Sequence, residues 1–371
     1  MLFLILTFIS VVRAASYDPN LTWRGMFTEH FRIHFHGGEE QVAEEMAHVA
    51  ERAFDIMTEE LQWTPDLPTE IVLIDNTDIA NGYATYLPFN TIVIYITAPD
   101  GNSTLSLYED WNEAIFTHEL THILHMDTIE GATVIFRKIL GKIVAINGLV
   151  PGWVIEGQAT MQETWQTAAG RGRSNIAHMI KRTTVLTDTF PPLGNMEGFQ
   201  TQWPSGNLRY LFGQDFMNYI AMNYGEEVWT HWNHEYGEGI PYLLPSKRVF
   251  GKRLHPLYLE WKDSFFDRYT EQITDIREEG ESVFDIISPK EQNCMGASLS
   301  PDGRKLIFAC SDLYKGANIY ISDPDGSDAE IEVANAFARD FTWRSDSQAY
   351  AYSAIRSVNR FNLYSDVYLR N

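Results

Sequence analysis

The sequence predicts an α+β fold followed by an all-β segment, and two observations carry this prediction. Three stretches with strand patterns fall before residue 100, and the chain then shows helical spacing almost throughout, to about residue 280. Beyond Glu281 the pattern changes to short strands separated by Pro, Gly and Asp turns. With 371 residues, the chain is long enough for about two domains, each with its own core.

The elements of the first part follow from local patterns. Residues 29–36 alternate polar and apolar side chains, which predicts a half-exposed strand. Apolar residues at helical spacing predict a long helix over 39–62. Two strands rich in Ile and Val are expected over 69–75 and 91–97, with a polar loop between them. Further helices are expected over 110–126, 154–165, 207–224, 226–235 and 256–276.

Beyond Glu281 the sequence repeats itself. The stretch that begins at Ser300 returns at Arg344, and the one at Asn318 returns at Asn362, so both offsets are 44 residues (344 − 300 and 362 − 318). A period near this length with hairpin turns is typical of a four-stranded propeller blade. The chain stops inside its second repeat, whereas propellers close with about four blades or more. We therefore expect an incomplete propeller and a longer parent protein.

The N-terminus carries the pattern of a secretory signal. Leu2 to Val12 is apolar except for Thr7 and Ser10, and small residues precede a cleavage position after Ala14. The run is too short to span a bilayer, which needs about 20 residues. No Lys or Arg precedes it, so a short buried strand or a misassigned start is the alternative. We expect residues 1–14 to be a signal peptide and the protein to be periplasmic or extracellular.

The charge balance disfavours several partners. Lys+Arg 28 against Asp+Glu 50 gives a net charge of −22. Such a surface repels phosphate backbones, so we expect no nucleic-acid partner, and it disfavours anionic membrane surfaces. No stretch after the N-terminal run is long and apolar enough to span a bilayer, so no membrane insertion of the mature chain is expected. Two cysteines are too few for a disulfide framework or a cysteine-rich zinc module.

The stretch that carries chemistry is the H-E-x-x-H motif from His118 to His122, inside the helix expected over 110–126. Residues four apart share one helical face, so both imidazoles can reach a single metal ion. Glu119 lies about 100° round the helix and can serve as a general base toward water at that metal. A chance match in a chain of this composition has a probability of roughly 0.02. The alternative is two surface histidines beside a glutamate.

A catalytic zinc site needs a third protein ligand. The metzincin pattern is excluded, because it requires glycine and histidine where this chain has His125 and Thr128. His125 shares a face with His118 but lies one turn beyond the pair, and we expect it to pack near the site. Glu156 begins the next expected helix, where the helix dipole alone also favours a glutamate. Gly157 is expected to let that helix pack closely against the motif helix. The spacing leaves the choice of ligand open.

A family resemblance bears on this choice. H-E-L-T-H, followed 34 residues later (156 − 122) by the glutamate of W-V-I-E-G-Q-A, resembles the gluzincin metallopeptidases of the peptidase MA clan. The resemblance implies a zincin-like domain over residues 15–280, with a small sheet and a mostly helical C-terminal part. It implies one Zn²⁺ per chain, held by His118, His122 and Glu156, with Glu119 as the base. A peptide or protein substrate is implied as well.

The same resemblance implies a role for a tyrosine. In gluzincin aminopeptidases the tyrosine of a Y-x-x-G motif donates a hydrogen bond to the developing oxyanion, and Tyr210-Leu211-Phe212-Gly213 fits this motif. The alternative is a core tyrosine, one of 18 in the chain. The G-A-M-E-N-type segment, by which those aminopeptidases hold a free amino terminus, is missing. Endopeptidase and exopeptidase action therefore both stay open.

The C-terminal repeats carry a second resemblance. S-P-D-G-R-K-L-I-F-A and A-N-I-Y-I-S-D-P-D-G resemble TolB-like, WD-type propeller repeats. Together with the motif helix, they resemble exported bacterial proteins in which an MA-like peptidase domain precedes a propeller; the resemblance covers residues 26–371. It implies that residues 281–371 form about two blades, which would offer a docking surface to a protein partner or substrate.

Three smaller groups carry open alternatives. Cys294 and Cys310 flank one turn and can face each other across a hairpin, where an exported protein can form a disulfide. A metal patch and a plain exposed strand face both fit the three histidines of the first strand. The turn at 170–173 is basic and either grips a substrate carboxylate or pairs with the acidic surface. The strand histidines are His30, His34 and His36.

These inferences lead us to expect an exported zinc-dependent peptidase. The strand over 91–97 is the expected pairing partner for an extended substrate, because edge strands bind peptides by strand addition. Two alternatives stay open. One is a non-catalytic exported propeller scaffold with a structural or decayed zinc site, which the presence of Glu119 disfavours. The other is a zinc hydrolase that acts on bonds other than peptide bonds.

Overall fold

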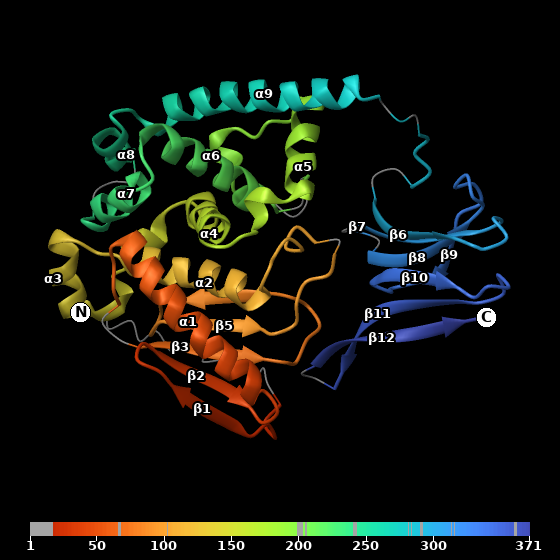
Figure 1. Cartoon of the computed structure of the whole chain (residues 1–371), viewed down its shortest axis with the longest axis horizontal. Coiled ribbons are helices and arrows are strands. Elements are labelled where there is room, and N and C mark those ends of the chain that lie inside the picture. Colours follow the sequence, from red (N-terminus) through yellow and green to blue (C-terminus); the bar gives the residue numbers. More distant parts are fainter. Residues whose placement is uncertain are drawn as a thin grey trace, which may run out of the picture.

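The structure is a computed structural model that describes most of the chain from residue 18 onward. The segment expected to be a signal peptide lies outside the described residues. The architecture is α+β: a mixed sheet with two covering helices, then a helical region, then two antiparallel sheets (Figure 1). Not described are residues 1–17, 66–67, 102, 199–202, 205, 240–242, 281, 283, 290–291, 313, 315 and 360–361.

The first sheet has five strands in the order β1-β2-β3-β5-β4. Its three central strands, β2, β3 and β5, are parallel to one another, and both outer strands are antiparallel to their neighbours. Alternating burial along β2 matches the alternation predicted from its sequence. The strands are β1 (Trp23–Phe27), β2 (Phe31–His36), β3 (Thr69–Ile74), β4 (Gly82–Thr85) and β5 (Thr91–Tyr95).

Two helices cover this sheet and bury its apolar side chains. The helices are α1 (Glu40–Leu61) and α2 (Trp111–Asp127), and one core joins them to β2, β3 and β5. α2 starts where Asp110 accepts hydrogen bonds from the backbone N–H groups of Asn112 and Glu113. This cap fixes the helical register, and with it the face that the motif histidines share.

Strand β4 corrects one expectation. The sequence analysis assigned the role of edge strand to residues 91–97, but β5 is paired on both sides, with β3 and with β4. The free edge at this end of the sheet belongs to β4 (Gly82–Thr85), inside the stretch expected to be a polar loop. The edge position expected for residues 91–97 therefore belongs to β4.

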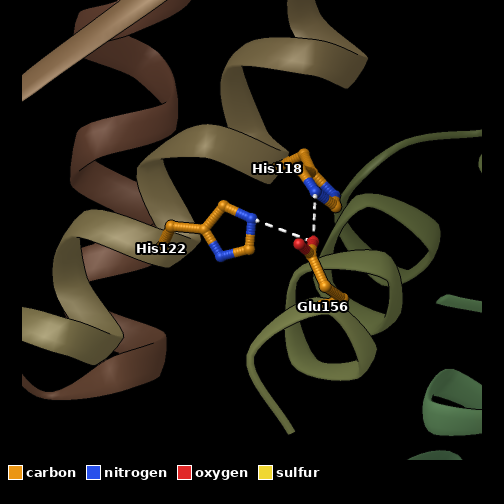
Figure 2. Close-up of side chains that lie close together, drawn as sticks. All are labelled: His118, His122 and Glu156. Atoms are coloured by element: carbon orange, nitrogen blue, oxygen red, sulfur yellow. Dashed lines mark ion pairs between the residues drawn. The ribbon is translucent and has the colours of Figure 1, made fainter. Parts of the chain in front are cut away.

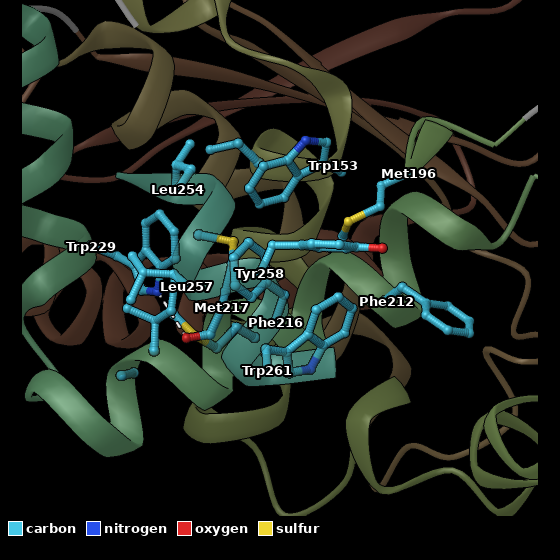
Figure 3. Close-up of a cluster of buried hydrophobic side chains, with 14 of the residues drawn as sticks. Trp153, Met196, Phe212, Phe216, Met217, Trp229, Leu254, Leu257, Tyr258 and Trp261 are labelled. Carbon is cyan, nitrogen blue, oxygen red and sulfur yellow. Dashed lines mark hydrogen bonds between the residues drawn. The ribbon is translucent and has the colours of Figure 1, made fainter. Parts of the chain in front are cut away.

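The helical region is built around a second core, which is rich in aromatic side chains. Phe216 stacks on Trp261 and lies tilted against Trp153 (Figure 3). Phe190 also packs against Trp261. α4 lies between α2 and α6 and so joins the two cores. The helices are α3 (Gly131–Leu140), α4 (Gly152–Gln166), α5 (Asn175–Leu186), α6 (Leu208–Tyr224), α7 (Val228–Gly237), α8 (Leu243–Phe250) and α9 (Leu254–Glu278), with short 3-10 turns η1 (Gly141–Ile143), η2 (Ile146–Leu149), η3 (Arg171–Arg173) and η4 (Leu193–Asn195).

One buried ion cluster ties this region together. Asp215 of α6 accepts hydrogen bonds from Lys181 of α5 at 2.9 Å and from Trp261 of α9 at 2.8 Å. Arg268 of α9 donates hydrogen bonds to both oxygens of the same carboxylate. Although burial alone raises the pKa of Asp215, the two cations lower it to about 2. Three helices are therefore joined at one carboxylate.

The C-terminal part consists of two antiparallel sheets that share a small core (Figure 1). Cys294 and Cys310 are opposite each other in β6 and β7 and form a disulfide. The described residues form no closed propeller. One sheet holds β6 (Asn293–Leu299), β7 (Leu306–Asp312), β8 (Gly316–Ser322) and β9 (Glu330–Val333); the other holds β10 (Ala338–Trp343), β11 (Tyr350–Val358) and β12 (Asn362–Arg370).

The C-terminal sheets touch the first sheet through one loop. The backbone N–H of Asp78, between β3 and β4, donates to Leu363 O of β12 at 2.9 Å, and Leu363 N–H donates to Asn76 O at 2.8 Å. The Tyr364 hydroxyl donates to Asp75 O at 2.9 Å. Among the described residues, no helix has both the length and the apolar character needed to cross a bilayer.

Candidate metal centre

The structure brings together His118 and His122 of α2 and Glu156 of α4 (Figure 2). The Nε2 atoms of the two histidines lie 3.5 and 3.3 Å from Glu156 Oε2. One potential ligand atom from each residue lies within 4.8 Å of the others. This is the trio that the gluzincin resemblance implies, and the two histidines share one face because they are one helical turn apart.

The electrostatics of the trio favour a bound cation. Burial and Arg171 lower the pKa of His118, but hydrogen bonds to Glu156 and Glu163 outweigh them and raise it to about 9. Burial alone raises the pKa of Glu156, but the two histidines outweigh this effect and hold the pKa of Glu156 far below its usual range. Without a metal, His118 therefore carries a proton toward Glu156 at neutral pH, and a bound cation would take the place of that proton. This set of two nitrogen donors and one oxygen donor suits a divalent metal ion.

A glutamate that the sequence analysis did not single out orients His118. Glu163, two turns beyond Glu156 on α4, accepts a hydrogen bond from His118 Nδ1 at 2.9 Å and is 5% exposed. A proton on Nδ1 leaves the lone pair of Nε2 directed at the shared centre. Such a carboxylate–histidine pair fixes the ring and its tautomer, as is usual for histidines that bind metals.

Arg171 completes this arrangement. Its guanidinium donates to both carboxylate oxygens of Glu163, at 2.8 and 2.7 Å, and its backbone N–H donates to Glu163 Oε1 at 2.9 Å. Burial raises the pKa of Glu163, but Arg171 and His118 lower it to about 2. The basic turn at 170–173 was expected to meet a substrate carboxylate or the acidic surface. Instead, Arg171 is buried at the base of the site.

His125, the other candidate for the third ligand, points elsewhere. It is fully buried, and its ring nitrogens hydrogen-bond none of the described residues. Burial and the neighbouring His122 lower its pKa to about 3, so the ring is neutral at ordinary pH. It is not part of the trio, and it does not line the cavity at the site.

Glu119 lies beside the trio, at the floor of a cavity of about 530 Å³. Burial raises the pKa of its carboxyl above the ordinary value, although both histidines oppose the shift. The edge strand β4 passes very close by: a Cβ at Gly82 would be 2.9 Å from Ile115 and 3.1 Å from Glu119 Oε1. Glycine at this position therefore lets the strand border the cavity.

Tyr210 lines the same cavity as Glu119. Its ring centroid lies 6.3 Å from that of His118. Its helix, α6, approaches α4 so closely that a Cβ on Gly157 would be 2.7 Å from the carbonyl carbon of Gly213. Gly157 thus serves the contact between α4 and α6 rather than the expected one with the motif helix. Because Tyr210 is one turn before Gly213, this contact places its ring at the site.

The histidines of β2 do not form a common patch. His30 bonds Glu51 at 2.6 Å, and His34 bonds Glu70 at 2.6 Å. His36 approaches Glu39 and Asp75 in a second group whose potential ligand atoms lie within 4.8 Å of one another. There His36 and Glu39 form an i,i+3 ion pair at 3.0 Å and Asp75 is exposed. A proton on His36 is sufficient for this pair.

Comparisons with known proteins add little to this geometry. The chain matches no protein-family model, and no curated protein is significantly similar to it. Among solved structures, it is similar to Legionella pneumophila aminopeptidase A in complex with aspartic acid, with a TM-score of 0.38 and 11% identity. The match covers 85% of this chain and 36% of that chain, so this chain spans about a third of its length. So distant a likeness leaves the function to be argued from the site itself.

Proposed function

We propose that this protein is an exported zinc-dependent metallopeptidase of the gluzincin type. The observation that carries the proposal is the convergence of His118, His122 and Glu156 beside Glu119, with Glu163 and Arg171 holding the first histidine. A purely structural zinc site needs no buried carboxylate next to its ligands. The cavity above the trio leaves room for a substrate.

The trio would hold one Zn²⁺ through two imidazole nitrogens and one carboxylate, a ligand set found in catalytic zinc sites. When bound, zinc supplies Lewis acidity that activates a water molecule and polarises a substrate carbonyl. The chain's own contribution is to keep the ligands aligned. Glu163 holds the Nδ1 proton of His118, and Arg171 keeps Glu163 ionised, so that His118 Nε2 faces the centre.

Glu119 is the proposed general base. Its carboxyl takes a proton from the attacking water and later passes it to the leaving amine. A base works best when its pKa lies near the operating pH, and burial shifts the pKa of Glu119 upward, in that direction. Gly82 and Ile115 close the cavity around this carboxyl, which limits competing access of solvent.

Tyr210 is the proposed oxyanion donor. Burial and the charge of Glu156 raise the pKa of its phenol to about 12, so the hydroxyl keeps its proton at neutral pH. A neutral phenol can donate a hydrogen bond to the substrate oxygen as negative charge develops there. It lines the same cavity as Glu119.

The substrate is proposed to be an extended peptide. β4 is the strand at one edge of the first sheet, and its residues Gly82, Tyr83 and Ala84 line the cavity. A peptide that adds to this edge gains backbone hydrogen bonds beside the trio, independent of its side chains. We propose this strand, in place of β5, as the substrate-binding edge.

The C-terminal sheets are proposed to be blades of a TolB-like propeller that offers a surface to a partner. The support is the 44-residue repeat and the antiparallel four-stranded sheet β6–β9. Export is supported by the apolar N-terminal run and by the Cys294–Cys310 disulfide, since disulfides persist in oxidising compartments.

The deciding experiment measures zinc content and peptide cleavage together. Glu119→Gln is expected to keep one zinc per chain, because the residue is not a ligand, and to lose nearly all hydrolysis of a peptide library. Glu113→Gln changes a half-buried glutamate on the same helix that pairs with Arg52; it is the matched control and should behave like the wild type. A fully zinc-loaded wild type that cleaves no peptide or protein would establish the non-catalytic scaffold instead.

A further inference from the structure

Helix α3 and the turns after it expose their apolar side, which is the reverse of an ordinary surface helix. Their polar side chains point inward: the Thr133 hydroxyl donates to Glu130 O at 2.7 Å and also to Gly237 O, and Arg137 donates to Asp127 Oδ1 at 2.9 Å. Helices of globular proteins normally bury an apolar stripe and expose the polar one. Here the apolar side chains are the ones left outside.

Six large apolar side chains form this outer surface, which we call the α3 face. All of them are 54% to 74% exposed. Those at 135, 136, 139 and 140 follow helical spacing, so they lie on one side of α3, and Ile143 and Leu149 belong to the turns that follow the helix. Exposed apolar patches of this kind mark interaction sites. The α3 face consists of Ile135, Phe136, Ile139, Leu140, Ile143 and Leu149.

The charge of this segment is opposite to that of the chain. Residues 131–149 contain three basic side chains and no acidic one, in a protein with a net charge of −22. Arg137 and Lys142 both bind the buried Asp127, which leaves a local charge of +2 (3 − 1), and Lys138 is exposed. The acidic neighbours, Glu130 and Glu238, flank Gly131 at the start of the helix.

We propose that the α3 face docks on the surface of an anionic phospholipid bilayer, with its apolar side chains among the acyl chains and Lys138 at the head groups. Amphipathic helices bind membranes in this way. Charge decides against a second copy: in a two-fold dimer the same basic face would meet itself, whereas anionic head groups complement it. The net charge of −22 disfavours anionic membranes for the molecule as a whole, but the negative charge elsewhere is screened beyond about 8–10 Å at physiological salt, so the α3 face departs from that expectation.

The α3 face continues onto the hairpin that borders the cavity. Lys142 Nζ donates to Asn90 Oδ1, and Gly148 lies against the Tyr86 ring. Leu87 and Phe89, in the same β4–β5 turn, are 38% and 49% exposed. Docking therefore brings β4 toward the lipid surface. The proposal does not depend on the peptidase function and stands or falls separately.

Flotation with vesicles of phosphatidylcholine, with and without phosphatidylglycerol, tests the proposal on the full chain. Ile139→Ser combined with Ile143→Ser is expected to weaken partitioning about 100-fold, roughly tenfold for each side chain. Val367→Ser combined with Leu369→Ser, which changes two equally exposed aliphatic residues of β12, should have no effect. Lys138→Glu should remove the preference for phosphatidylglycerol and leave binding to phosphatidylcholine.

A second measurement reports on the face directly. Because both native cysteines are paired, Ile139→Cys can be labelled alone with an environment-sensitive fluorophore, whose emission should rise and shift to the blue on vesicles. Unchanged thermal melting of the serine variants shows that the fold is intact. The proposal is overturned if the wild type does not float, if the double serine variant floats equally well, or if light scattering shows a dimer that this variant dissociates.

Discussion

The guanidinium of Arg171 lies over the ring of Tyr210, with its Cζ atom 4.6 Å from the ring centroid. The same guanidinium holds Glu163, which in turn holds His118. One buried cation therefore connects the proposed oxyanion donor to a proposed metal ligand. Changes on either side of this chain of contacts should have distinct kinetic signatures.

Tyr210→Phe should lower kcat by on the order of 100-fold and change KM little, because the lost hydrogen bond forms only as charge develops on the substrate oxygen. The ring and its contact with Arg171 stay, so the thermal midpoint should hardly move. Steady-state kinetics on a cleaved peptide give both parameters. Tyr224→Phe, at the far end of α6, is the control; a Tyr210→Phe enzyme with more than about a third of wild-type kcat would mean that the oxyanion donor is another group.

Glu163→Gln should weaken zinc binding about 10- to 100-fold, because His118 loses the acceptor that sets its tautomer. It should also destabilise the fold by about 3–5 kcal/mol, since the buried Arg171 loses its partner. Competition with a chelator and urea unfolding measure the two effects. Glu130→Gln, which breaks a more exposed histidine–glutamate pair with His234, serves as the control and should leave zinc affinity unchanged.

Glu156→Gln should release zinc far more readily than His125→Gln. Glu156 faces both motif histidines at 3.3–3.5 Å, whereas His125 is buried away from them as a neutral ring. Metal analysis after dialysis against a weak chelator compares the two variants. Equal losses from both would contradict Glu156 as the third ligand.

The Asp215 cluster makes the fold sensitive to acid. Its pKa is about 2 in the folded protein against 3.8 ordinarily, so its ionised form contributes stability above about pH 4 that is lost as the pH falls through 2. This contribution is about 2 kcal/mol. Urea unfolding between about pH 6 and pH 2 should show this loss in the wild type.

Asp215→Asn should remove that part of the acid dependence and cost about 3–5 kcal/mol near neutral pH, because Lys181 stays buried without its counter-charge. Asp346→Asn breaks an exposed pair with Arg344 and should leave stability nearly unchanged. An Asp215→Asn protein as stable as the wild type would show that the cluster does not join the helices.

The sequence predicted the elements whose patterns are local. The helices over 39–62 and 110–126 differ from α1 and α2 by one residue at each end. The apolar spacing of α1 is long and regular, whereas α2 is buried on nearly all sides and its start is marked by the Asp110 cap. β4 was missed because Gly-Tyr-Ala-Thr is short and carries no run of β-branched residues. The helix α3 was not expected, although its apolar spacing is regular.

The residues of the site likewise divide into those that a local pattern predicts and those that only the folded chain brings together. The spacing of His118 and His122 on one helix is a local property, so a motif can find it. Glu163 and Arg171 acquire their roles only in the folded chain. After α4 ends, the chain reverses direction through η3, and this places Arg171 against Glu163. A single sequence shows a glutamate and an arginine eight residues apart, a separation that fits many unrelated arrangements.

The loop that joins β3 to β4 has a consequence for how the cavity is held open. Tyr364 and Asp75, which share a hydrogen bond there, are 289 residues apart in the chain, and Asn76 and Asp78 pair with Leu363 as a strand would. A few residues later the same loop becomes β4, the rim of the cavity. The rim therefore pairs with β5 and is preceded in the chain by a loop that is hydrogen-bonded to β12, near the C-terminus. We therefore expect a displacement of β12 to move the loop that leads into the cavity's edge.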